Sequence, residues 1–232
     1  MTEELPKYIV VGSKPWNKTI FESRISTYPG RWTYIDDPNK VTVKFLSKIN
    51  PKYLFFLHWS LLVPDTITEK FECICFHMTD VPFGRGGSPL QNLILRGHTA
   101  TRLTALKMVH DFDAGPVYIK RDLSLNGDAE EIYIRATELA AVMIKDIIEK
   151  NPTPVPQKGK AVIFQRRLPD KSRIPALKTP ESLYDFIRML DAYGYPKAFI
   201  TYKGYRFEFS NASCKNGEIR SDVIITKSGE RS

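Results

Sequence analysis

The stretch ECICFHMTDVPFGRGGSPLQNLILRG, residues 72–97, decides how the rest of the chain is interpreted. Its first seven residues form a short apolar run typical of a buried strand, and its last ten have helical character. The strand ends with a histidine, and an aspartate, an arginine and three glycines follow before the helix, which a core strand does not require. Because glycine lets the backbone turn sharply and approach a ligand closely, we expect a binding or catalytic site here.

Strands and helices alternate on both sides of this stretch. KYIVVGS (residues 7–13) and PKYLFFLHWS (residues 51–60) are apolar runs of strand length, each followed by a segment with helical features. Residues 128–150 give the strongest helix prediction, because Asp128 can cap the helix and Glu131 holds the matching capping-box position. This alternation predicts an α/β fold, a Rossmann-like and mostly parallel sheet covered on both faces.

The chain changes character at NPTPVPQKGK, residues 151–160, where three prolines indicate a linker or a strap along the surface. Beyond it, residues 180–190 have a helical pattern, and residues 198–209 read as a hairpin turning at Lys203 and Gly204. We therefore expect a catalytic domain over residues 1–155 and a small C-terminal α+β domain over residues 156–232.

Composition limits the function classes. The net charge of +8 makes anionic partners plausible, such as nucleic acid, a membrane surface or a nucleotide. Three cysteines are an odd count, and the simplest interpretation is a reducing compartment. The first residues lack the positive charge and long apolar run of a signal peptide, and no apolar run reaches the length of a membrane span. We expect a cytoplasmic protein with no membrane segment.

Candidate chemistry begins on the strand before the glycine-rich loop. Side chains alternate along a strand, so Cys73, Cys75 and His77 share one face, and His77 lies near the strand's C-terminal end. Histidine can transfer protons or stabilise developing charge, although it could equally be satisfied in a core. Asp113, two residues before a glycine and just after another strand, could lie at the same edge or simply shape a turn. Zinc ligation, with His58 as a further ligand, is disfavoured because a C-x-C strand holds its thiols apart.

The glycine-rich loop offers one guanidinium, that of Arg85, and we expect it to recognise a nucleotide or carboxylate. Gly86 and Gly87 would let the backbone approach the same ligand. Ser88 can cap a helix that begins at Pro89, so Ser88 and Pro89 have a structural explanation. Neither this loop nor VVGSKPWN (residues 10–17) matches a phosphate-binding or dinucleotide-binding pattern.

The order of these features resembles one family. A strand with its histidine, an R-G-x-x-P loop, a helix, a strand and then D-x-G is the layout of formyltransferases that use 10-formyltetrahydrofolate. Residues 76–94, 166–174 and 192–199 look most similar to the members that formylate a UDP-linked 4-amino-4,6-dideoxy sugar of the altrose type. The resemblance places the family's catalytic histidine at His77, its aspartate at Asp113, and its asparagine at Cys75, where a thiol is a weaker donor.

The resemblance also implies ligand-binding positions. For the pterin ring of the folate it indicates Ser60, Leu61, Leu62, Ile67, Val109, His110, Asp111 and Phe112. For the sugar nucleotide it indicates Ser13, Lys14, Trp16, Arg85, Gly86 and Gly87. Lys14 could instead be a solvated surface lysine, and Trp16 could pack in the core. Where Cys75 replaces asparagine, Asn92, His58 or a backbone N–H could supply the missing donor.

We therefore expect an N-formyltransferase that uses 10-formyltetrahydrofolate, needs no metal, and acts on the 4-amino group of a nucleotide-linked sugar. The amine would attack the formyl carbon, and His77 would stabilise the oxyanion while Asp113 orients His77 or accepts a proton. This hypothesis includes no nucleic-acid partner and allows a homodimer. One alternative is a methionyl-tRNA formyltransferase, for which the aromatic and basic C-terminal hairpin could stack on RNA. Another is an inactive ligand-binding paralogue.

Overall fold

The computed structural model describes residues 4–229, which divide into two compact units that are described separately. Unit 1 takes the chain up to residue 86 together with residues 101–123 and 134–163. Unit 2 takes residues 87–100 and 124–133 and the chain from residue 164 onward. The predicted division into 1–155 and 156–232 stays a prediction.

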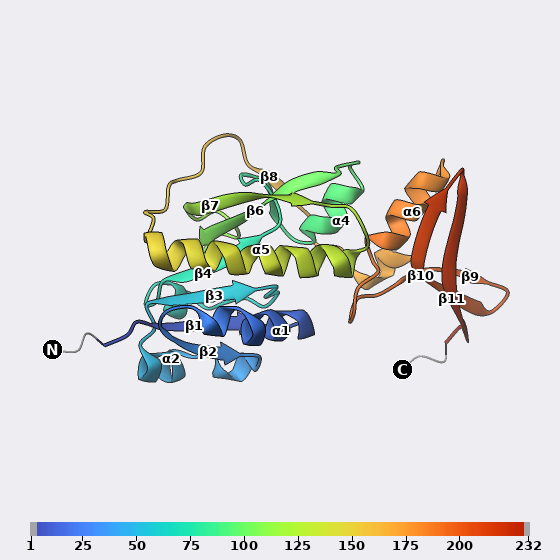
Figure 1. The fold of residues 1–232 in the computed structure, drawn as a ribbon. Coiled ribbons are helices and arrows are strands. Elements are labelled where there is room, and N and C mark those ends of the chain that lie inside the picture. Colours follow the sequence, from blue (N-terminus) through green and yellow to red (C-terminus); the bar gives the residue numbers. More distant parts are fainter. Residues whose placement is uncertain (1–3, 230–232) are drawn as a thin grey trace. The chain divides into compact units, whose positions relative to one another are not determined.

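Unit 1 is built on a six-stranded sheet with the order β2-β1-β3-β4-β6-β7 (Figure 1). Its strands are β1 (Lys7–Gly12), β2 (Arg31–Ile35), β3 (Tyr53–Leu57), β4 (Cys73–His77), β6 (Ala100–Lys107) and β7 (Val117–Ser124). The first four run parallel to one another, and β6 runs antiparallel to β4. The prediction of an α/β fold with a mostly parallel sheet is confirmed.

The central strands β1 and β3 are buried on both faces of the sheet. On one face, Leu46 and Ile67 pack with apolar side chains of β1, β3 and β4 in a single core cluster. These two residues belong to α2 (Val43–Ile49) and α3 (Asp65–Thr68). Helices α1 (Pro15–Ser23) and α5 (Ala129–Lys150) lie next to each other, joined by a hydrogen bond from Asn17 Nδ2 to Thr137 Oγ1 of 3.2 Å. Short 3-10 turns occur at Ile25–Thr27, Pro38–Lys40 and Pro169–Ser172.

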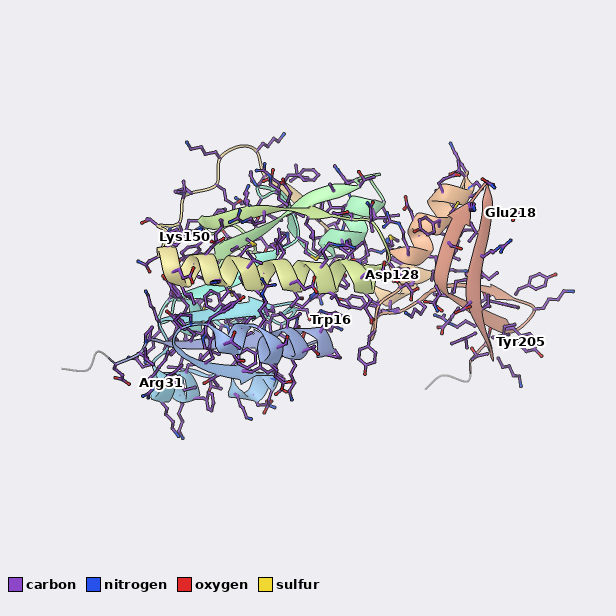
Figure 2. All side chains as sticks on the ribbon, viewed as in Figure 1. Trp16, Arg31, Asp128, Lys150, Tyr205 and Glu218 are labelled. Atoms are coloured by element: carbon purple, nitrogen blue, oxygen red, sulfur yellow. The ribbon has the colours of Figure 1, made fainter. Side chains whose placement is uncertain are left out.

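The long helix α5 confirms the capping prediction. The backbone N–H of Glu131 donates to Asp128 Oδ1 at 2.9 Å, and the backbone N–H of Asp128 donates to Glu131 Oε2 at 3.1 Å. Figure 2 shows the helix extending between Asp128 and Lys150. No helix among residues 4–229 has the length and apolar character needed to cross a bilayer.

Unit 2 contains a three-stranded antiparallel sheet and two helices. The strands are β9 (Ala198–Tyr202), β10 (Tyr205–Lys215) and β11 (Glu218–Lys227), and the helices are α4 (Pro89–Ile94) and α6 (Pro180–Arg188). The hairpin predicted over residues 198–209 is therefore present as β9 and β10. Helix α4 begins at Pro89 as predicted, but the predicted Ser88 cap is wrong. Ser88 has a left-handed φ of 50°, and its Oγ accepts the backbone N–H of Arg167 at 3.0 Å.

The proline-rich segment of residues 151–160, here called the strap, runs along unit 1. Val155 forms an antiparallel bridge with Val117 through two backbone hydrogen bonds of 2.8 Å. Beyond the strap, β8 (Val162–Phe164) pairs with β5 (Phe83–Gly86), the first half of the glycine-rich loop. The sequence did not predict β5, β7, β8 or β11. The strap therefore connects the glycine-rich loop and the β6–β7 region within unit 1.

Candidate active site

His77 is the last residue of β4, and its side chain is 9% exposed. Its Nε2 lies 2.7 Å from the backbone carbonyl oxygen of Gly84 in β5. Because a carbonyl oxygen only accepts, Nε2 must carry a proton in this contact. The other ring nitrogen, Nδ1, lies 3.4 Å from Asp113 Oδ1, so the structure brings the two predicted catalytic residues together.

Asp113 does not lie at the end of a strand that runs parallel to β4, although its side chain does reach His77. Strand β6 runs antiparallel to β4 and ends at Lys107, opposite Ile74, rather than at the His77 end. The loop over residues 108–116 then brings Asp113 back toward His77. Asp113 itself has a left-handed φ of 53°, a conformation that is uncommon for a non-glycine residue and is often found at functional sites.

The second carboxylate oxygen of Asp113 binds the glycine-rich loop. Oδ2 accepts the backbone N–H of Gly86 at 2.9 Å, where Gly86 has a φ of 101° that only glycine adopts easily. The loop therefore contacts both members of the pair, through the Gly84 carbonyl at His77 and the Gly86 N–H at Asp113. Four polar groups thus join the end of β4, the nearby glycine-rich loop and the loop that carries Asp113.

Arg85, expected to bind substrate, instead contacts a residue of the strap. Its Nε and Nη2 donate to Gln157 Oε1 at 3.1 and 2.8 Å. Gln157 Nε2 in turn donates to the carbonyl oxygens of Asp113 and Gly115, each at 2.8 Å. No sequence pattern indicated Gln157, because a single carboxamide in a proline-rich segment belongs to no periodic pattern.

Cys75 shares the face of β4 with Cys73 and His77. Burial, together with the negative charge of Asp113, raises the pKa of the Cys75 thiol well above its ordinary value. Burial and Glu72 raise the pKa of Cys73 to about 12. Both thiols are therefore protonated at neutral pH, so neither is a ready nucleophile, and Cys75 can offer only a weak S–H donor. No three His, Cys, Asp or Glu side chains within residues 4–229 are grouped as a metal ion would require.

The loops that follow β3 and β6 expose apolar side chains. Leu61 and Leu62, which follow β3, are 55% and 72% exposed, and Val109 and Phe112, which follow β6, are 40% and 71% exposed. The loops are joined where His110 Nδ1 lies 2.8 Å from Asp65 Oδ2, a contact that raises the pKa of His110. The other positions predicted for the pterin differ in exposure: Ser60 and Asp111 are exposed, and Ile67 is buried in the core cluster.

The loop after β1 packs against the end of β3. Ser13 Oγ donates to the carbonyl oxygen of His58 at 2.8 Å, and the Trp16 ring meets the His58 ring edge-on at 5.7 Å. Trp16 is 7% exposed, which agrees with the alternative that it packs in the core. Burial and the charge of Lys14 lower the pKa of His58 to about 3, so its ring is neutral at physiological pH. Burial also lowers the pKa of Lys14.

Asn92, considered as a replacement donor, is committed elsewhere in unit 2. Its Nδ2 donates to the carbonyl oxygens of Gly87, Ser88 and Gln165, and its Oδ1 accepts from Arg96. Gly87 is needed for space in the same place, because an added Cβ would lie 2.5 Å from the Cβ of Arg166. This part of the loop therefore fixes the chain after β8.

Comparisons with known proteins find several formyltransferases. Residues 169–226 match the family model described as the C-terminal domain of methionyl-tRNA formyltransferase. A solved structure of methionyl-tRNA formyltransferase from Clostridium thermocellum is 46% identical with a TM-score of 0.91, over 96% of this chain and 100% of that one. A methionyl-tRNA formyltransferase from Thermodesulfovibrio yellowstonii is 24% identical over 81% of this chain and 63% of its own length.

Further matches extend this result. The methionyl-tRNA formyltransferase of Rickettsia felis is 27% identical over 68% of this chain and 53% of its own. This chain thus spans between 53% and 63% of the length of these two curated relatives. A 4-N formyltransferase structure from Francisella tularensis, 15% identical with a TM-score of 0.66 over 94% of this chain and 96% of that one, shares the fold.

These matches correct two expectations. The predicted nucleotide-sugar substrate is wrong, because the matches with high identity are to methionyl-tRNA formyltransferases and the sugar enzyme is a distant neighbour. The predicted absence of a nucleic-acid partner is wrong for the same reason. The nucleotide-sugar roles expected for Ser13, Lys14, Trp16 and Arg85 no longer have a ligand to support them.

Proposed function

Because this chain belongs to the formyltransferase family that includes the methionyl-tRNA formyltransferases, we propose that it formylates the amino group of methionyl-tRNA. The family is made of enzymes that transfer formyl groups. The observation that carries the choice of acceptor is the 46% identity, over its full length, with the Clostridium thermocellum enzyme.

The distribution of charge supports an RNA acceptor. Residues 158–232 carry 15 Lys and Arg against 8 Asp and Glu, whereas residues 1–157 carry 19 against 18. Nearly all of the net charge of +8 therefore lies in the C-terminal third, which includes the segment matched by the tRNA formyltransferase model. Clustered cations supply the phosphate contacts on which nucleic-acid affinity depends.

The small sheet of unit 2 also exposes aromatic rings. Tyr202 and Tyr205 pair across β9 and β10 and are 60% and 50% exposed, and Lys203 lies in the turn between them. Exposed aromatic rings beside cations form stacking surfaces for unpaired bases. We assign this hairpin to contact with the tRNA.

The formyl donor in this proposal is 10-formyltetrahydrofolate. A pterin is a flat ring that needs apolar cover and backbone hydrogen bonds. The exposed Leu61, Leu62, Val109 and Phe112 can provide such cover, and the last two belong to the loop that carries Asp113. The residues present therefore fit this ligand. When bound, it supplies the formyl group that the amine receives.

His77 and Asp113 divide the remaining chemistry. The Nε2 contact of His77 is tight at 2.7 Å, whereas the Nδ1 contact of 3.4 Å is longer than an ordinary hydrogen bond. Nε2–H is already donated to Gly84, so the imidazolium form would present Nδ1–H to a substrate oxygen as negative charge develops there. The Asp113 carboxylate stabilises the imidazolium and, at 17% side-chain exposure, can accept the proton that the attacking amine loses.

The test is direct. The purified chain is mixed with 10-formyltetrahydrofolate and methionyl-tRNA, and N-formylmethionine is sought by mass after the ester is hydrolysed. We expect turnover with methionyl-tRNA, none with N-acetylmethionyl-tRNA, and far less with free methionine. The rate at low tRNA concentration should fall steeply as salt rises from about 50 to 200 mM. No formylmethionine from any methionyl-tRNA would refute the proposal.

A further inference from the structure

Gln157 holds the loop that carries Asp113, and it does so from the strap. Its carboxamide makes four hydrogen bonds within unit 1: two from the Arg85 guanidinium to Oε1, and two from Nε2 to the carbonyl oxygens of Asp113 and Gly115. All four lie between 2.8 and 3.1 Å. Oε1 of Gln157 thus accepts two hydrogen bonds, and Nε2 donates both of its hydrogens.

The partners fix which way the carboxamide points. A guanidinium only donates and a backbone carbonyl only accepts, so the oxygen of Gln157 must face Arg85 and the nitrogen must face the loop. A flipped amide would oppose donor to donor and acceptor to acceptor. Arg85 therefore sets the orientation in which Gln157 can bind both carbonyls at once.

Those two carbonyls belong to the left-handed turn at Asp113. A φ of 53° costs an aspartate free energy, of order 1 kcal/mol or more, and persists only where the surroundings enforce it. By bridging residues 113 and 115, Gln157 enforces that turn. In this conformation the Asp113 carboxylate reaches both the Gly86 N–H and Nδ1 of His77.

We propose that Gln157, oriented by Arg85, is a positioning residue for formyl transfer that holds Asp113 against His77; this rests on the proposed function. Anchoring of the strap does not explain the side chain, because the two backbone hydrogen bonds between Val155 and Val117 already attach the strap next to it. The carboxamide therefore holds Asp113 in place and is not needed to anchor the strap.

The decisive variant is Gln157→Glu. A carboxylate keeps the acceptor that Arg85 binds, and strengthens it with charge, but sets an oxygen against the two loop carbonyls. We expect kcat to fall about 10- to 100-fold, as for a displacement of about 1 Å, with KM for both substrates within about twofold of wild type. Gln157→Ala should lose the same activity. Thr153→Ala, at an exposed position of the same strap, is the control and should leave kcat unchanged.

A double-mutant comparison separates positioning from a merely structural role. In an Asp113→Asn background, Gln157→Glu should lower kcat by less than about twofold, because the group it positions is already lost. Wild-type activity retained in Gln157→Glu would overturn the proposal. So would a loss of the same size in both backgrounds.

An NMR measurement that needs no substrate tests the positioning role independently of whether methionyl-tRNA is the acceptor. The chain has four histidines, so ¹⁵N-histidine labelling with a His77→Ala reference identifies the ring of His77. We expect Gln157→Glu to shift the Nδ1 resonance of His77 in the same direction as Asp113→Asn does. An unmoved resonance would refute the positioning role even if methionyl-tRNA proved not to be the acceptor, whereas the shift would support it in that case.

Discussion

Replacing Gly115 by alanine should uncouple Asp113 from His77 without touching either residue. An added Cβ at Gly115 would lie 1.8 Å from the carbonyl oxygen of Lys107, where real contacts essentially never fall below 3.0 Å. The loop over residues 108–116 must therefore retreat from the end of β6 by about 1.2 Å. This explains why the sequence has a glycine two residues after Asp113.

The size of the effect follows from that displacement. The Nδ1–Oδ1 separation of 3.4 Å between His77 and Asp113 is already long, and a further 1.2 Å would break the contact. A misplacement of about 1 Å can lower a rate by about 100-fold, equivalent to roughly 2.7 kcal/mol of barrier. Overpacking should also reduce the free energy of unfolding by about 1–3 kcal/mol.

The assay measures single-turnover formyl transfer to methionyl-tRNA beside urea unfolding of the same protein. The matched control is Gly97→Ala, where an added Cβ meets nothing within 4 Å and only the φ of 78° is strained. It should lose about 1 kcal/mol of stability and keep its rate. A folded Gly115→Ala protein with a rate within twofold of wild type would show that the position of Asp113 does not limit catalysis.

Cys75, His58 and Phe112 give three further predictions. Cys75→Ala should lower kcat by less than about tenfold, since its protonated thiol is a weak donor; a loss as large as that of His77→Ala would contradict this. The folded-state pKa of His58, about 3, lies below the ordinary 6.5, so the unfolded chain binds the extra proton between these values. The contribution of His58 to the free energy of unfolding should be fully present above about pH 6.5 and should fall with decreasing pH by at most about 1.4 kcal/mol per pH unit. In His58→Asn, where asparagine tolerates the left-handed backbone, the free energy of unfolding measured in urea should depend less on pH across that range. Phe112→Ser should raise KM for 10-formyltetrahydrofolate about tenfold with kcat unchanged, because covering a phenylalanine contributes about 1.5–3 kcal/mol; an unchanged KM would remove Phe112 from the folate site.

Local patterns were enough to predict most of the fold. The apolar runs of β1, β3 and β4 and the capping box at Asp128 and Glu131 carry their signals within a few residues. Strand β7 was missed because the sequence from Val117 to Ser124 interrupts its apolar residues with Lys120, Arg121 and Asp122. The Ser88 cap was wrong because tertiary contact with the backbone of Arg167 decides the conformation of that serine.

The site was predicted in part. His77 and Asp113 could be paired from their order along the chain and the resemblance that this order supports, although the antiparallel direction of β6 was not visible in the sequence. Gln157 lies 44 residues from Asp113, and the role that we propose for it depends on a strap that packs beside β7. The acceptor was misjudged because residues 76–94, 166–174 and 192–199 were matched to the sugar-modifying members of the family, and RNA contact by the basic and aromatic C-terminal hairpin was kept only as an alternative.

The most direct test of the central claim is a double-mutant cycle on His77 and Asp113, measured by single-turnover formyl transfer to methionyl-tRNA. Asparagine at position 113 can keep both the left-handed turn and an acceptor for the Gly86 N–H, so Asp113→Asn removes the charge alone. If the two residues act as one unit, His77→Ala and Asp113→Asn should each lower the rate by about 10²- to 10³-fold, and the double variant should be no slower than the slower single. Losses that multiply, or an Asp113→Asn rate equal to that of wild type, would contradict the account.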